Sequence, residues 1–110
     1  MMRFGQVLRI NVNRADEYRR YHAEIWPEIT GAMRQAGLSN WTIFLKDDML
    51  FSYFEYAGPP EEYETRMARL AAAPRMREWW DIMESIQIPL PTRKPGEWWA
   101  SMEPVFRFDG

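Results

Sequence analysis

The chain has 110 residues, 46% of them hydrophobic, and a formal net charge of −2; for this length we expect a single domain, residues 1–110, with its own core and no second one. Because the chain contains no cysteine, disulfides, thiolate nucleophiles and thiolate metal sites are excluded, and a reducing cytoplasm is the expected compartment. The arginines are interleaved with acidic residues and the N-terminal residues lack a long apolar run, so we expect neither nucleic-acid binding nor a signal peptide or membrane segment.

The first third of the chain predicts a strand followed by a broken helix. Apolar and polar residues alternate over residues 3–12, which is the pattern of a half-buried strand. Asn13 is a candidate helix N-cap, and apolar positions then recur at helical spacing as far as Gly37, a candidate C-cap. Pro27 lacks an amide hydrogen and clashes with the preceding turn, so we expect it to break this segment and to begin a second helix.

The rest of the chain predicts a hairpin, two helices and a closing strand. Residues 40–45 and 49–56 are strand-like runs separated by a short polar turn. Two amphipathic helices follow, each beginning at a proline, the second at Pro74. Three prolines and a glycine indicate a loop over residues 87–96, and residues 102–108 form the last predicted strand.

This order of elements predicts a ferredoxin-like α+β fold, in which helices cover one face of an antiparallel sheet. Such a sheet leaves its other face uncovered. The run 49–56 carries apolar residues on both of its sides, so we expect the second face to be buried as well. A second copy of the chain, giving a homodimer, is the simplest way to cover it.

His22 is the chain's only histidine, and it is therefore the one side chain whose usual pKa, about 6.5, permits proton exchange near neutral pH. Tyr18 lies four residues earlier, so that on a helix both side chains share one face and can reach one small ligand. Ordinary core contacts are the more frequent use of such a pair, and spacing alone leaves both interpretations open. A lone histidine is an incomplete metal-ligand set, so we expect no metal.

The six tryptophans are the second notable feature, because they exceed what a core of this size usually needs. Trp79 and Trp80 are adjacent on a predicted helix, where neighbours point about 100° apart. At most one of them can face a core fully, and the other can line a cleft. Trp98 and Trp99 raise the same question, with a dimer contact as the alternative. Phosphate-binding and nucleophile-elbow motifs are absent.

Several motifs resemble those of the L-rhamnose mutarotases, and together they cover nearly the whole chain. They are Tyr18 with His22 and Ile25-Trp26-Pro27-Glu28; Gly37 followed by Ser39-Asn40-Trp41-Thr42-Ile43-Phe44-Leu45; Leu50-Phe51 with Glu55; Trp79-Trp80; and Pro104-Val105-Phe106. The resemblance implies a dimeric ferredoxin-like α/β barrel that interconverts the α and β anomers of a 6-deoxy sugar without a cofactor.

Carried over position by position, the resemblance implies that His22 is the proton donor, Tyr18 a substrate contact, and Trp79 and Trp80 the wall of the pocket. Trp41 stands where the family commonly has a substrate-contacting tyrosine. An indole N–H only donates, so a hydroxyl that could both donate and accept is lost there. The sugar is then L-rhamnose or a similar deoxy sugar such as L-fucose.

Two other functions fit the same predicted fold. Dimeric ferredoxin-like barrels also include small oxygenases and haem-handling enzymes, in which one histidine can bind iron or activate a substrate. A module that binds a sugar without turning it over is the second alternative. Mutarotation itself needs one proton donor and one acceptor, and acid-base catalysis of this kind contributes about 10²–10⁴-fold.

Overall fold

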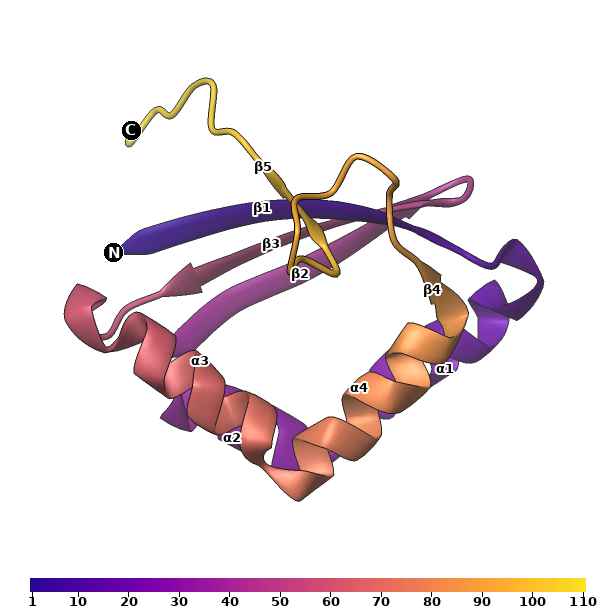
Figure 1. Ribbon diagram of the computed structural model, residues 1–110, viewed down its shortest axis with the longest axis horizontal. Coiled ribbons are helices and arrows are strands. Elements are labelled where there is room, and N and C mark those ends of the chain that lie inside the picture. The colour runs from indigo at the N-terminus through magenta and orange to yellow at the C-terminus, as the bar shows by residue number, and fades with distance from the viewer.

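One antiparallel sheet with helices packed on one of its faces makes up the computed structural model, which describes residues 1–110 (Figure 1). The sheet has the order β2-β3-β1-β4, and β5 pairs with β1. Its strands are β1 (Met2–Ile10), β2 (Leu38–Lys46), β3 (Met49–Tyr56), β4 (Gln87–Ile88) and β5 (Ala100–Met102). The predicted ferredoxin-like α+β architecture, with helices on one side of an antiparallel sheet, is confirmed.

The three long strands, β1, β2 and β3, form most of this sheet. β2 and β3 are the predicted hairpin, and β3 then pairs with β1 along its length, from Met2 opposite Tyr56 to Arg9 opposite Met49. The other edge of β1 is shared, because β4 pairs near its C-terminal end and β5 near its middle. β1 is therefore paired on both of its edges, and β2 is an open edge strand.

Four α-helices lie on one side of the sheet: α1 (Ala15–Ala23), α2 (Pro27–Gln35), α3 (Tyr63–Ala72) and α4 (Pro74–Ile86) (Figure 1). Two 3₁₀ turns, η1 (Val12–Arg14) and η2 (Pro60–Glu62), precede α1 and α3. Pro27 and Pro74 occupy first helical positions, where a missing N–H costs nothing, so the predicted helix break is confirmed. None of the helices combines the length and the apolar character needed to cross a membrane.

The cap predicted at Asn13 is wrong by two residues. Asn11 is the capping residue: its side chain accepts a hydrogen bond from the backbone N–H of Asn13, which lies inside η1 (3.1 Å). The capping asparagine thus starts a 3₁₀ turn, and α1 begins without a side-chain cap. Gly37 follows the C-cap of α2 with φ +90°, as predicted for a residue in the left-handed region at this position.

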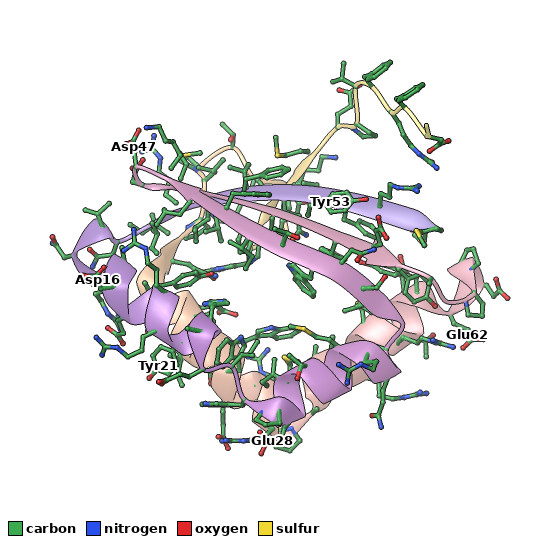
Figure 2. All side chains as sticks on the ribbon, turned by 180° about the vertical axis from the view of Figure 1, so that it is seen from behind. Asp16, Tyr21, Glu28, Asp47, Tyr53 and Glu62 are labelled. Carbon is green, nitrogen blue, oxygen red and sulfur yellow. The ribbon has the colours of Figure 1, made fainter.

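The strands alternate between two very different environments. Inward-facing residues of the long strands pack against the helices and supply much of the core, including Leu8, Ile10, Leu50, Phe54 and Tyr56, which are each at most 4% exposed. On the outward face, Phe44 and Phe51 are 59% and 37% exposed and stack on each other. Figure 2 shows side chains from the sheet and the helices extending into the space between the two layers.

The predicted last strand, residues 102–108, is wrong in position. The strand that forms is β5 (Ala100–Met102), and residues 103–110 are exposed without regular structure. Pro104 cannot donate a ladder hydrogen bond, so pairing cannot run through it. Val105, Phe106 and Phe108 are each more than 80% exposed, and this C-terminal tail extends beyond the sheet, away from the helices (Figure 1).

Candidate active site

A cavity of about 810 Å³ opens between the inner face of the sheet and the helices. All five residues singled out in the sequence line it. Its lining comprises Tyr18, Arg19, His22 and Ile25 from α1 and the turn after it; Thr30 and Met33 from α2; Trp41, Ile43, Leu45 and Leu50 from the hairpin; Arg77, Trp79, Trp80, Met83 and Glu84 from α4; and Gln87, Trp98 and Trp99 after it. Segments far apart in the sequence thus meet at one mostly apolar site.

His22 is held in one tautomer by the backbone of its own helix. Its Nδ1 lies 2.8 Å from the carbonyl oxygen of Tyr18, and a carbonyl only accepts, so Nδ1 carries the hydrogen. In the neutral ring Nε2 is then the free acceptor. Burial lowers the pKa of His22 from its usual 6.5, and the hydrogen bond to the carbonyl raises it by less. The imidazole is therefore neutral at pH 7.

Tyr18 lies beside this imidazole, with ring centroids 4.5 Å apart. Its side chain is almost fully buried, at 5% exposure, and its hydroxyl accepts a hydrogen bond from Nε2 of Gln87 at 2.9 Å. Burial raises the pKa of Tyr18 to about 12, and the hydrogen bond from Gln87 lowers it by less. The phenol thus keeps its proton at any pH at which the protein would be assayed.

The paired tryptophans of α4 divide between core and cavity, as their angular separation predicts. Trp79 is 3% exposed and meets His22 and Trp26 edge to face, at centroid distances of 5.4 and 5.2 Å. Trp80 is half-buried, and the guanidinium of Arg77 lies 6.0 Å from its ring. Both indoles reach the cavity, where Trp79 also packs against the imidazole and restricts its movement.

Trp41 presents its ring, and not its N–H, to the cavity. Its Nε1 donates to Oγ of Ser52, a fully buried residue, at 2.8 Å. The indole also stacks on Phe54, with centroids 4.4 Å apart. Because the only polar atom of Trp41 is already bonded within the protein, the side chain acts at this site as an apolar wall.

The sequence analysis missed one residue of the site, Gln87, and did not decide the role of a second, Trp98. Gln87 was assigned to a loop, but it lies in β4 and bonds Tyr18. Its spacing from Trp80 and Glu84, seven and three residues, continues the cavity-facing stripe of α4, and this signal could have identified it. For Trp98 the sequence left two roles, lining a cleft or contacting a dimer partner. In the structure it lines the cavity, and its Nε1 donates to Oε1 of Gln87 at 2.9 Å. No cluster of three or more potential metal ligands is present.

Fold and site together define a class: a ferredoxin-like protein of the α/β-barrel type, with a neutral histidine and a protonated phenol in an aromatic cavity. Two solved structures share the fold. An L-rhamnose mutarotase from Formosa agariphila superposes with a TM-score of 0.76 at 23% identity, covering 99% of this chain and 100% of that one. Tetracenomycin F2 cyclase from Streptomyces glaucescens gives 0.75 at 15% identity, covering 100% and 99%.

Sequence comparison identifies the family. A family model described as L-rhamnose mutarotase matches residues 3–108. An L-rhamnose mutarotase from Burkholderia orbicola is 36% identical over 102 residues, 93% of each chain. One from Lactiplantibacillus plantarum is 33% identical over 86 residues, 78% of this chain and 80% of the other. The chain belongs to the L-rhamnose mutarotase family, whose members are isomerases that interconvert anomers. The family resemblance seen in the sequence motifs is confirmed.

Proposed function

We propose that this chain is an isomerase that interconverts the α and β anomers of L-rhamnose or a similar 6-deoxy sugar. The observation that carries the proposal is the state of His22, a half-buried neutral imidazole with Nδ1 hydrogen-bonded and Nε2 left as an acceptor. Membership of the family supplies the sugar class. The cavity volume, about 810 Å³, accommodates a monosaccharide with room to spare.

In the proposed reaction, Nε2 of His22 takes the proton of the anomeric hydroxyl and then donates it to the ring oxygen. Both oxygens are bonded to the same carbon, so one nitrogen can reach each in turn. As the ring oxygen gains the proton, its bond to the anomeric carbon breaks and the anomeric oxygen becomes an aldehyde. Rotation about the adjacent carbon–carbon bond followed by the reverse transfers gives the other anomer. The resemblance implies that His22 is a proton donor, and this role corresponds to the second transfer, from Nε2 to the ring oxygen.

The other residues of the site have binding roles in this proposal. The protonated hydroxyl of Tyr18 donates a hydrogen bond to a sugar oxygen, which its high pKa supports. Trp79 and Trp80 pack against the apolar C–H surface of the sugar and keep water from the opened aldehyde. Trp41 forms the opposite wall through its ring, since its N–H is bonded to Ser52.

The experiment that tests this proposal measures NMR saturation transfer between the α and β anomeric protons of L-rhamnose, with L-fucose in parallel. Wild-type protein should accelerate exchange, and His22→Asn should lose about 10²–10⁴-fold of that acceleration. Tyr21→Phe is the matched control, because Tyr21 lies on the same helix but outside the cavity lining. Wild-type protein that accelerates neither sugar, or a fully active His22→Asn variant, would contradict the proposal. A fluorescence response to sugar without exchange would instead indicate a binding module.

We further propose that the chain acts as a homodimer, with the outward face of the sheet against a second copy. Phe44 and Phe51 form an exposed stacked pair on that face. The C-terminal tail of the same chain carries three more exposed apolar side chains. A two-fold dimer would remove both from water, because such an interface buries the same patch on each copy. The absence of cysteine agrees with a reducing compartment, and we propose the cytoplasm.

A further inference from the structure

We infer that Gln87 and Trp98 are positioning residues that fix the Tyr18 hydroxyl as a hydrogen-bond donor to the sugar, an inference that rests on the proposed function. Three side chains form a chain of hydrogen bonds at the cavity: Nε1 of Trp98 donates to Oε1 of Gln87, and Nε2 of Gln87 donates to the Tyr18 hydroxyl, each at 2.9 Å. The three residues come from α1, β4 and the segment before β5, and all of them line the cavity.

The chemistry of the three groups permits only one direction for this chain. An indole N–H donates and never accepts, so the carbonyl end of the Gln87 amide must face Trp98. The amide nitrogen of Gln87 then faces Tyr18, and because it only donates, the phenol oxygen must accept. The donor that remains is the hydrogen of the Tyr18 hydroxyl. The Tyr18 hydroxyl forms no hydrogen bond within the protein in which it donates.

Burial makes this direction persistent. Gln87 is 8% exposed and Tyr18 is 5% exposed, so losing either hydrogen bond would be costly, and a flipped amide would set two donors against each other at Trp98. Accepting a hydrogen bond also polarises the phenol and strengthens it as a donor. The Tyr18 hydrogen is thus directed to the cavity, where a sugar oxygen is the acceptor that completes the chain.

Gln87→Glu tests this inference because it changes the direction at nearly constant shape. The new carboxylate still accepts from Trp98, but it accepts from Tyr18 as well and turns the Tyr18 hydrogen away from the sugar. We expect kcat/KM for L-rhamnose exchange, and the affinity for L-rhamnose measured by calorimetry, to fall by about 10–100-fold, as for the loss of one buried hydrogen bond to a ligand. Tyr18→Phe should lose a similar amount, and Gln87→Glu should add little to it.

The pH dependence supplies a readout that a merely structural role would not change. Protonation of the new carboxyl restores a donor toward Tyr18, so the defect of Gln87→Glu relative to wild type should shrink as the pH is lowered. His22 titrates in both proteins, and its effect cancels in this ratio. Gln87→Met is the uncharged control of similar size: it should show a loss that is also coupled to Tyr18→Phe, but with a ratio to wild type that does not vary with pH.

The outcomes separate this inference from the proposed function. Wild-type exchange together with full activity in both Gln87 variants, or losses that add to that of Tyr18→Phe, would overturn the inference and leave the proposed function intact. Wild-type protein that binds L-rhamnose without exchange would overturn the proposed function, and the same coupling would then be read from the dissociation constants. Protein that neither exchanges nor binds L-rhamnose would overturn both.

Discussion

At the scale of single residues, His22 is prepared as a proton acceptor by two neighbours with different effects. The Tyr18 carbonyl fixes the tautomer and slightly favours the charged ring, whereas burial among aromatic rings disfavours the charged ring more strongly. The net result is a lowered pKa and a neutral imidazole with a free Nε2. A base in this state is available throughout the neutral pH range, in which mutarotation without an enzyme is slow.

This lowered pKa gives a pH-dependence prediction. Because the neutral ring is the active form, kcat/KM for anomer exchange should be constant at neutral and higher pH and fall as the pH drops through a midpoint below the usual value of 6.5. No loss is expected up to pH 9, since the pKa of Tyr18 is raised to about 12. Saturation-transfer rates, corrected for the uncatalysed rate at each pH, measure the profile. A rate that rises on acidification would assign activity to the imidazolium.

The pair of Trp41 and Ser52 gives a second prediction at this scale. Trp41→Phe removes the one donor bonded to the fully buried Ser52 hydroxyl, and we expect the free energy of unfolding to fall by about 1–3 kcal/mol from this loss alone. In a double-mutant cycle, Ser52→Ala should cost less in the Trp41→Phe background than in wild type. Denaturant unfolding of the four proteins measures the coupling, and additive losses would show that the hydrogen bond contributes nothing.

At the scale of elements, α2 contains one glycine, Gly31, and is followed by another, Gly37, and the two have opposite roles. Gly31 lies inside the helix, and an added Cβ would meet no atom within 4 Å. Gly37 follows the helix at φ +90°, where an added Cβ would lie 3.2 Å from Cε1 of Tyr56 and 3.1 Å from Nη1 of Arg66. Alanine therefore suits the first position and is strained at the second.

We accordingly predict opposite effects of the same substitution. Gly31→Ala should raise the free energy of unfolding by about 0.5–1 kcal/mol, because alanine has the higher helix propensity and adds no clash. Gly37→Ala should lower it by about 1–2 kcal/mol, because its backbone conformation disfavours a side chain. Thermal or urea unfolding measures both, and each variant serves as the control for the other. Effects of equal sign would contradict this interpretation of α2.

The accuracy of the sequence predictions also varied by element, for physical reasons. The long strands and the starts of α2 and α4 were predicted because alternation and proline at a first helical position are local signals. The position predicted for β5 was wrong because its three residues pair with β1, which is distant in the sequence, so no local pattern indicates them. His22, Tyr18 and the tryptophan pair could be singled out from spacing and resemblance. The link from Gln87 to Tyr18 joins residues 69 positions apart, and no local pattern carries that information.

At the scale of the whole molecule, the two faces of the sheet serve different purposes. One face and the helices surround the cavity, and the inner side chains of the sheet face this second layer. The outer face has no second layer in a single chain, and Tyr53 lies on it together with the stacked phenylalanines (Figure 2). Exposed stacked aromatic side chains on a sheet face are unusual in a stable protein, and this asymmetry is why the dimer is proposed on this face.

The dimer proposal makes a prediction about mass in solution. Wild-type protein should sediment at twice the chain mass of 13.2 kDa, and a double variant, Phe44→Lys with Phe51→Lys, should sediment as a monomer, because four ammonium groups would face one another across a two-fold axis. Val12→Lys is the control, since Val12 is as exposed as Phe44 but lies in η1, outside the strands. A wild-type monomer would contradict the proposed dimer, and a double variant that remains dimeric would place the interface on another face. Because the cavity lies on the opposite side of the sheet, the monomeric variant should still bind L-rhamnose, and its residual exchange rate would show how much the dimer contributes to catalysis.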